Sequence, residues 1–256
     1  MENRITAFID ILGFSQAVET LPEKKLLNIV SSFYLYEQSA SESRKMNDEF
    51  ALEIIAPKQA TFFSDCLVIS VQPKHVGTLI TSISQLTGAF MRHGFFLRGG
   101  VCLGQLLHSD NVVLGPALIG AYKIESKESV YPRVVVNEEV YDLCLKYCSK
   151  PVSERDYCNL SPLEKLNENC KPLRRIKKDD DECLYINPFP LSLTLHLWEN
   201  VGVKNHVDLA IYLNEIICKA LSEYSSSENI HKKYVWLARK YNEEYKSSKG
   251  FTEIEI

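Results

Sequence analysis

Residues 7–15 constrain this chain more than any other stretch, because they place one carboxylate, Asp10, inside an apolar run that ends at Gly13. An apolar run of this kind that stops at a glycine is typical of a buried strand. A buried carboxylate needs a partner, and magnesium or manganese is a suitable one because both prefer oxygen ligands. The stretch therefore indicates a site that handles phosphate groups. A simpler alternative is that Asp10 caps a helix that begins near Phe14.

Composition sets broad limits on the kind of protein. The chain has 256 residues, of which 45% are hydrophobic and 24% charged, as expected for a globular protein with a full core. No apolar run is long enough to cross a bilayer and no leader pattern precedes the first strand, so we expect a cytoplasmic protein without a membrane partner. The net charge of -4 gives no general attraction to nucleic acid. The eight cysteines contain no CxxC pair and are expected to be reduced thiols.

Hydrophobic periodicity along the chain predicts an alternation of strands and helices. The expected strands are residues 5–12, 50–63, 66–71, 95–107, 133–136 and 183–187. The expected helices are residues 14–21, a longer one that starts at Pro22 and fades within 39–48, and residues 73–94, 116–126, 206–222 and 230–245. Proline and polar residues favour a long loop over 150–170, and the opposite charges of residues 174–182 favour a solvated hairpin turn.

These elements predict an α+β fold in which helices flank an antiparallel-rich mixed sheet. We expect residues 1–148 to form the core. Residues 149–256 would add an edge hairpin and C-terminal helices that pack on the core or on a dimer partner.

A second acid, Asp65, lies between two apolar segments rich in β-branched and aromatic residues, at the tip of an expected hairpin. Because consecutive strands are usually neighbours in a sheet, Asp10 and Asp65 should emerge at the same edge and could bridge two cations. Two cations suit phosphoryl transfer, since one lowers the pKa of an attacking hydroxyl while the other neutralises the leaving group.

The two acids lie in motifs that resemble those of a known enzyme family. The segment FIDILGFS at residues 8–15 resembles the first metal-binding motif of the class III nucleotidyl cyclases, and FFSDCLVIS at 62–70 resembles their second. LRGGVCLGQLL, GPALIGAYKIE and PRVVV follow in the family's order, so the similarity spans about residues 4–147. The resemblance implies a ferredoxin-like core and two Mn²⁺ or Mg²⁺ ions bound by Asp10, Asp65 and the backbone carbonyl of Ile11.

Three positions depart from the purine cyclases of this family. Thr61 replaces the Lys or Glu that reads the purine base, four residues before the second metal-binding acid. Ile119 and Lys123 replace the Asn and Arg that face the triphosphate. The resemblance implies that Lys123, given by the opposite subunit, neutralises charge in the transition state and is catalytic together with Asp10 and Asp65. An ordinary surface lysine is the alternative for Lys123.

A narrower resemblance covers nearly the whole chain. The Ser64-Asp65 pair, the RGG and PRVVV strands, the GPAL helix that ends at Glu125 and the late segment KYVWLARKYN are similar to the pyrimidine cyclases of the Pycsar antiphage systems. This similarity implies a homodimer with active sites at its interface. It also implies synthesis of cyclic UMP from UTP, or less often of cyclic CMP from CTP, and a separate effector protein that responds to the product.

Three residues are candidates for binding the nucleotide. Thr61 and Phe62 could form the wall of a base pocket smaller than that of the purine enzymes, and Arg98 could reach the nucleotide. Core packing is the alternative for Phe62, and an ion pair or a carbonyl partner is the alternative for Arg98. The hydroxyl of Thr61 can serve either uracil or cytosine.

From the family resemblance we expect a uridylate cyclase. Three alternatives stay open: a cytidylate cyclase, a catalytically silent nucleotide sensor, and a purine cyclase with an altered pocket, which Thr61 disfavours.

Overall fold

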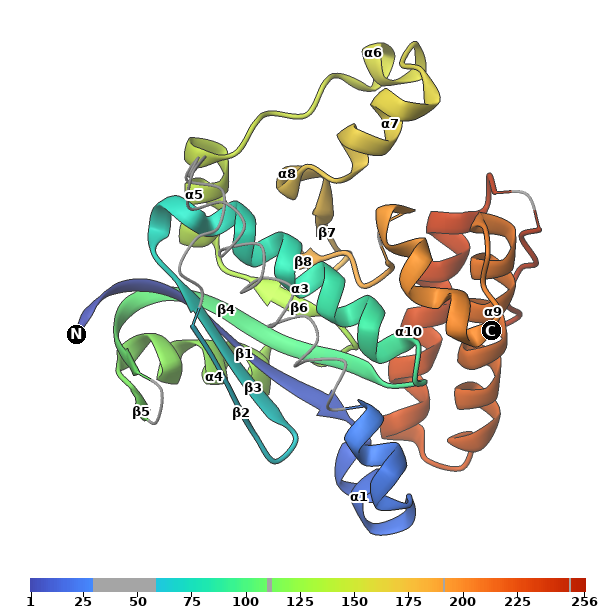
Figure 1. Ribbon diagram of the computed structural model, residues 1–256, viewed down its shortest axis with the longest axis horizontal. Coiled ribbons are helices and arrows are strands. Elements are labelled where there is room, and N and C mark those ends of the chain that lie inside the picture. The colour runs from blue at the N-terminus through green and yellow to red at the C-terminus, as the bar shows by residue number, and fades with distance from the viewer. Residues whose placement is uncertain (30–58, 110–111, 191, 249) are drawn as a thin grey trace.

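The computed structural model describes residues 1–29, 59–109, 112–190, 192–248 and 250–256, and within them it contains an eight-stranded sheet (Figure 1). The strand order is β2-β3-β1-β4-β6-β8-β7, and β5 pairs with β4 off this path. All neighbouring strands are antiparallel except β4 and β6, which are parallel. The strands are β1 (Glu2–Leu12), β2 (Gln59–Phe63), β3 (Cys66–Val71), β4 (Phe96–Ser109), β5 (Val112–Leu114), β6 (Val134–Val136), β7 (Ile176–Lys178) and β8 (Leu184–Ile186).

Helices cover both faces of the sheet and one of its ends. They are α1 (Phe14–Thr20), α3 (Val76–Met91), α4 (Pro116–Lys127), α5 (Glu138–Tyr147), α6 (Glu154–Cys158), α7 (Pro162–Asn169), α8 (Pro172–Arg175), α9 (His206–Glu223) and α10 (Glu228–Tyr245), with 3₁₀ helices at η1 (Pro73–His75) and η2 (Ser192–Val201). This is the predicted α+β fold with an antiparallel-rich mixed sheet flanked by helices. The expected strands and helices of the first 148 residues are present wherever the structure describes them. The expectations for residues 30–58 lie outside the described part of the chain.

Strand β1 lies inside the sheet, between β3 and β4, and its side chains alternate between two environments. Ile5, Ile9 and Ile11 point into the main core, which they share with buried residues of α3 and α5. The other face, which carries Asp10, is covered by α4 over β1 and β4. Gly100 of β4 permits this close approach, because a Cβ there would lie 2.4 Å from the carbonyl oxygen of Ala121 in α4.

The C-terminal helices α9 and α10 pack side by side at one end of the sheet (Figure 1). Trp236 of α10 stacks on Tyr131 with ring centroids 5.4 Å apart and meets the edge of Tyr185 from β8. The helical hairpin expected over residues 206–245 is therefore present and packs on its own chain. The division into a core and an extension at residue 148 stays a prediction.

One expectation for residues 149–190 is wrong and another is confirmed only in part. The expected loop over 150–170 contains α6 and α7, because Pro162 occupies the first turn of α7, where proline is tolerated, and Ser161 forms a capping box with Glu164. The charged segment 174–182 does form a hairpin, but it is not simply solvated. Asp179 is buried and contacts Arg133, Trp236 and Lys240, so its partners are distant in sequence.

No helix in the described ranges has both the length and the apolar character needed to cross a membrane.

Candidate active site

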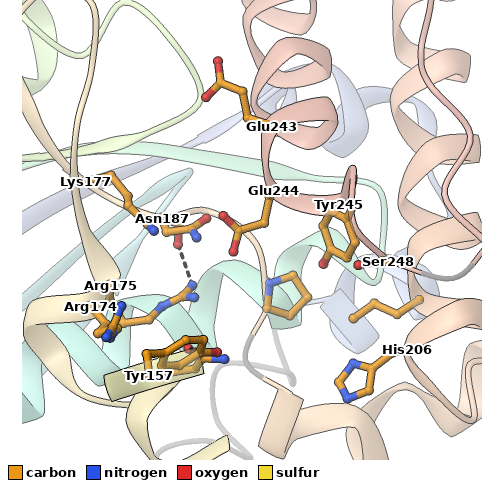
Figure 2. Close-up of a pocket in the computed structure, with 13 residues that line it drawn as sticks. Tyr157, Arg174, Arg175, Lys177, Asn187, His206, Glu243, Glu244, Tyr245 and Ser248 are labelled. Atoms are coloured by element: carbon orange, nitrogen blue, oxygen red, sulfur yellow. Dashed lines mark hydrogen bonds between the residues drawn. The ribbon is translucent and has the colours of Figure 1, made fainter. Parts of the chain in front are cut away.

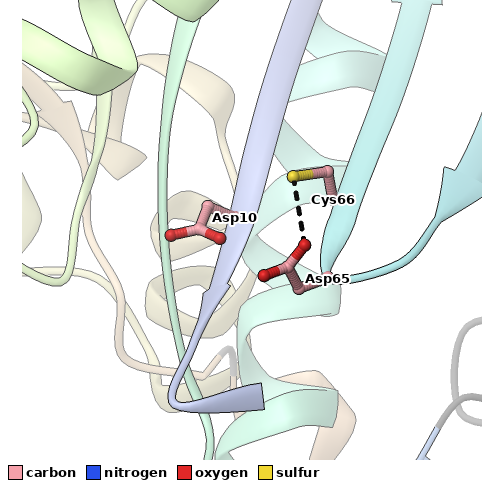
Figure 3. Close-up of side chains that lie close together, drawn as sticks. All are labelled: Asp10, Asp65 and Cys66. Carbon is pink, nitrogen blue, oxygen red and sulfur yellow. Dashed lines mark hydrogen bonds between the residues drawn. The ribbon is translucent and has the colours of Figure 1, made fainter. Parts of the chain in front are cut away.

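The two acids singled out in the sequence lie together on one face of the sheet. Asp10 is near the end of β1, where it pairs with Cys66 of β3, and Asp65 occupies the turn between β2 and β3. One ligand atom from each of Asp10, Asp65 and Cys66 lies within 4.8 Å of the other two (Figure 3). Residues 55 positions apart in the chain thus form a cluster with two carboxylates.

Local hydrogen bonds hold Asp65 in this position. Ser64 adopts the left-handed conformation, with φ 54°, which permits the tight turn. The backbone carbonyl of Asp65 accepts a hydrogen bond from the Ile11 amide at 3.0 Å, so the turn is joined to β1. The hydroxyl of Ser15 donates to Asp65 Oδ2 at 3.0 Å. Partial burial acts to raise the pKa of Asp65, but hydrogen bonds to its carboxylate, from the Ser15 side chain first and then from its own amide and the Ser64 and Cys66 side chains, outweigh burial and hold the pKa below its ordinary value.

Asp10 is held by an arginine from the neighbouring strand. Arg98 of β4 lies directly across from Asp10, and its Nε donates to Asp10 Oδ2 at 2.8 Å. The same guanidinium places Nη2 2.8 Å from Oε1 of Glu125 in α4. Arg98 therefore has the carboxylate partners that the sequence left open as an alternative to a nucleotide contact. The capping alternative for Asp10 is wrong, because the N-cap of α1 is Gly13 and has no side-chain cap.

Glu125 and Lys233 complete the charged surroundings of Asp10. Glu125 is buried, and desolvation raises its pKa despite the nearby Arg98. Lys233 comes from α10, more than 200 residues from Asp10. Its pKa is lowered by desolvation and by Arg98, while Asp10 and Glu125 act in the opposite direction. Lys233 begins the KYVWLARKYN segment, but nothing in the spacing of that segment marks a charged site, so sequence patterns alone do not single it out.

Cys66 is a third potential ligand, but its thiol is protonated at neutral pH. Burial, together with Asp65 and Asp10, raises the pKa of Cys66 to about 12. The donor set at neutral pH therefore consists of carboxylate oxygens, which suit Mg²⁺ or Mn²⁺ better than a thiophilic metal.

The structure separates the two residues expected to form a base pocket. Thr61 pairs with Val68, which pairs with Phe8 of β1, so Thr61 lies on the same face of the sheet as Asp10. Phe62 lies on the opposite face and packs against Phe14, with ring centroids 6.5 Å apart. The expectation that Phe62 walls the base pocket is therefore wrong, and the core-packing alternative describes it.

Lys123 is exposed on α4, as are Ile119 and Tyr122. Ile119 and Lys123 lie on the outer surface of the helix, whereas Ala121, Ile124 and Glu125 face the sheet. The ring of Tyr122 meets Phe8 of β1 edge-on, with centroids 5.4 Å apart. The sequence-based role of Lys123, a contact to a triphosphate bound by another subunit, requires such an exposed position.

A cavity of about 440 Å³ lies away from the acids, between α8, β7 and the C-terminal helices (Figure 2). Its arginines are already engaged within the chain. Arg174 pairs with Glu154 and Glu168, and Arg175 donates to the backbone carbonyl of Asn187 at 2.8 Å. Glu243 and Glu244 also line this cavity, and their negative charge disfavours a phosphate there.

Comparison with known proteins gives matches among solved structures only. No family model and no curated protein sequence matches this chain. The guanylyl cyclase domain of the RhoGC fusion protein from the aquatic fungus Blastocladiella emersonii is similar at a TM-score of 0.45 and 13% identity, over 72% of this chain and 94% of that one. The adenylate/guanylate cyclase/hydrolase from Silicibacter pomeroyi has a TM-score of 0.38 and 13% identity, over 73% and 96%.

A third similar structure is a bacterial light-regulated adenylyl cyclase, with a TM-score of 0.40 and 14% identity. The match covers 84% of this chain but only 55% of that longer one. At such distances the likeness extends to the fold alone. The case for a function therefore depends on the residues around Asp10 and Asp65.

Proposed function

We propose that this protein is a nucleotidyl cyclase that converts UTP into 3',5'-cyclic UMP and pyrophosphate. The observation that carries this proposal is the convergence of Asp10 and Asp65, whose ligand oxygens lie within 4.8 Å on one face of the sheet. Two carboxylates this close are suited to a pair of Mn²⁺ or Mg²⁺ ions. The hydrogen bond from the Ile11 amide to the Asp65 carbonyl keeps the Ile11 peptide beside Asp65, consistent with Ile11 as a further ligand.

The chemistry proposed is an in-line displacement without a covalent enzyme intermediate. The ribose 3'-oxygen bonds to the α-phosphorus as the bond from that phosphorus to the pyrophosphate oxygen breaks. Divalent cations, when bound, supply the positive charge that acidifies the 3'-hydroxyl and stabilises the leaving group. Ser15 and Arg98 orient the carboxylates of Asp65 and Asp10, and Lys233 adds a cationic group near the triphosphate.

A homodimer is part of the proposal. Large apolar side chains are exposed along the outer end of β4, on β5 and on α4: Leu107, Val112, Leu114, Ile119 and Tyr122. An apolar surface of this kind is typical of a protein interface. Lys123 lies on the same helix, so pairing of two chains through this surface would carry it toward the partner's nucleotide.

The signalling role follows from the product proposed. Cyclic UMP would act as a cytoplasmic second messenger that a separate effector protein detects during antiviral defence. The alternative product, cyclic CMP from CTP, would arise at the same site.

A catalytically silent sensor is the alternative from another class of function. Two observations favour it: Asp10 is already paired with Arg98, and Ile119 and Lys123 stand where the family has an Asn and an Arg.

Incubation of the purified protein with each nucleoside triphosphate and Mn²⁺ tests the proposal. We expect cyclic UMP as the main product, and we expect Asp10→Asn and Asp65→Asn to lower turnover by about a thousandfold, since each removes charge that binds the cations. Asp142→Asn, which changes an exposed carboxylate of α5, is the matched control and should retain full activity.

Binding of Mn²⁺ in the absence of nucleotide, followed by electron paramagnetic resonance, gives a second measurement. The two variants of the site should bind less Mn²⁺ than the Asp142→Asn control. A sensor would bind UTP without turnover in the wild type. Absence of a cyclic product from all four triphosphates, at a concentration where the dimer is populated, would refute the cyclase proposal.

A further inference from the structure

Lys233 of α10 is a half-buried cation that forms no hydrogen bond or ion pair with another residue of the described ranges. Burial lowers its pKa, as do the nearby Arg98 and Lys232, while Asp10 and Glu125 act in the opposite direction. An ammonium group that is partly removed from water without a hydrogen-bond partner is unfavourable. The site therefore holds, beside its carboxylates, a positive charge that a bound anion would stabilise.

The orientation of Lys233 follows from the periodicity of the helix. Trp236 and Lys240 lie three and seven residues after Lys233, so the three side chains share one face of α10. Trp236 and Lys240 are buried, which shows that this face packs on the body of the protein. Lys232, by contrast, is exposed, and its Nζ donates to Oδ1 of Asn229 in the first turn of the helix at 2.9 Å.

A buried carboxylate holds this face of α10 in place. Asp179, in the turn between β7 and β8, accepts a hydrogen bond from Nε1 of Trp236 at 2.8 Å. Its Oδ1 lies 3.1 Å from Nζ of Lys240. Both contacts lie within two turns of Lys233, so they determine where the Lys233 side chain leaves the helix.

Asp179 also connects α10 to β4, the strand beside β1. It pairs with the buried Arg133, whose carbonyl accepts a hydrogen bond from the amide of Gly99 at 3.1 Å. Gly99 directly follows Arg98, the residue that is paired with Asp10. The helix and the strand that carry the cations nearest to Asp10 are therefore joined through this carboxylate.

We infer that Lys233 binds the phosphate chain of the substrate and the pyrophosphate released from it, and that Asp179 positions Lys233 for this contact. This inference rests on the proposed nucleotide site. Asp10 is close enough to act on the pKa of Lys233, so phosphates bound at Asp10 lie within reach of this long, flexible side chain. A phosphate oxygen would give the ammonium a charge-assisted hydrogen bond in place of the water it has lost. Lys233 acts within its own chain, in contrast to the role expected for Lys123.

The affinity of the full chain for inorganic pyrophosphate in the presence of Mg²⁺, measured by isothermal titration calorimetry, tests the contact without any turnover. We expect Lys233→Gln to lower the affinity about thirtyfold, as for the loss of a hydrogen bond to a charged group, and Lys233→Arg to retain most of it. Lys232→Gln is the matched control, because it removes the same charge from the adjacent, exposed position, and it should bind as the wild type does. Equal losses in Lys232→Gln and Lys233→Gln, or a wild type that does not bind pyrophosphate, would overturn the inference.

A double-mutant cycle tests the positioning role of Asp179. Lys240→Met breaks one contact of Asp179 while the contacts with Arg133 and Trp236 stay, and it should lower the pyrophosphate affinity about fivefold. In the Lys233→Gln background the same change should have no further effect, because the positioning acts only through Lys233. Equal effects in both backgrounds would show a general structural role and refute the positioning.

Two further variants complete this cycle. Trp236→Phe removes the indole donor to Asp179 and replaces Lys240→Met if that variant does not fold. Arg239→Met is the control, because Arg239 is exposed and its nearest carboxylate contact, with Asp180, is 3.8 Å long. It should leave the pyrophosphate affinity unchanged in both backgrounds, and a loss as large as that of Lys240→Met would contradict the role of Asp179.

Failure of the proposed function and failure of this inference give different results. If UTP is cyclised while Lys233→Gln binds pyrophosphate as tightly as the wild type, the cyclase proposal stands and the inference is refuted. If no triphosphate is cyclised but pyrophosphate affinity is lost in Lys233→Gln and retained in Lys232→Gln, the cyclase proposal fails and the phosphate contact of Lys233 stands.

Discussion

The environment of His108 affects a measurable property of the whole protein, the pH dependence of its stability. Its pKa is about 4 in the folded chain, because of burial and the nearby Arg4, and about 6.5 when the chain is unfolded. Above pH 6.5 both states are neutral, and the stabilisation is fully present. Between pH 6.5 and pH 4 only the unfolded state takes up the proton, so the folded state loses stability as the pH falls.

We predict that this residue lowers the free energy of unfolding by about 3 kcal/mol between pH 6.5 and pH 4. Urea denaturation of the wild type and of His108→Gln at several pH values measures the effect, because carboxylates titrate alike in both proteins. His206→Gln, which changes an exposed histidine, should retain the wild-type dependence. An identical pH profile for the wild type and His108→Gln would contradict the depressed pKa.

Part of the candidate site could be predicted from individual residues of the sequence. Asp10 and Asp65 were visible because a carboxylate within an apolar run is unusual. The partners of Asp10 were not, since the Arg98 contact depends on the register of β1 against β4, and Lys233 reaches the site only through tertiary packing. The sequence could have predicted that Phe62 does not face the nucleotide. Phe62 follows Thr61 directly in the strand, and neighbouring residues of a strand point to opposite faces of the sheet.

At the scale of elements, the packing of α4 on the sheet depends on Gly100. A Cβ at this position would lie 2.4 Å from the Ala121 carbonyl and 2.8 Å from the amide of Glu125, so the helix backbone would have to move. We predict that Gly100→Ala lowers the free energy of unfolding by about 3 kcal/mol, at the upper end of the usual cost of overpacking. Displacement of Glu125 should also weaken its ion pair with Arg98 and reduce activity.

Gly104→Ala is the control for this prediction, because it lies on the same strand and faces the same helix. Its added Cβ would come no closer than 3.3 Å to the methyl group of Ala117, and a shift of a few tenths of an ångström relieves the contact. Chemical denaturation should show a much smaller loss for Gly104→Ala. Equal losses for the two variants would show that the approach of α4 at Gly100 is not the cause.

The elements were predicted best where hydrophobic periodicity was strong. The strands around Asp10 and Asp65 and the helices α3, α4, α9 and α10 all have this pattern. Helices α6 and α7 were missed because their formation depends on caps rather than on an apolar stripe. Ser153 and Ser161 accept hydrogen bonds from the first turns of these helices, and Pro162 was interpreted as a breaker although it opens α7.

At the scale of the whole molecule, the exposed apolar surface on β5 and α4 predicts self-association. Leu114 is 45% exposed and Ile119 is 56% exposed, which is unfavourable unless another chain covers them. We predict that Leu114→Glu shifts the protein from dimer to monomer in analytical ultracentrifugation, because a carboxylate would be buried in the interface. Turnover should fall together with the dimer, since Lys123 would no longer reach the partner's site.

Leu163→Glu provides the comparison for this experiment. Leu163 is more exposed than Leu114 but lies on α7, away from the proposed interface, so its replacement should leave the dimer intact. A wild-type chain that is monomeric at concentrations where it is fully active would contradict the dimer.

The last helix of the chain completes parts of the structure that are formed much earlier in the sequence. Trp236 and Lys240 of α10 contact the buried Asp179, which also pairs with Arg133, and Lys233 of the same helix lies near Asp10. During synthesis on the ribosome, these partners emerge only after the whole sheet has been translated. The charged surroundings of Asp10 and the partners of Asp179 are therefore complete only after α10 has been translated.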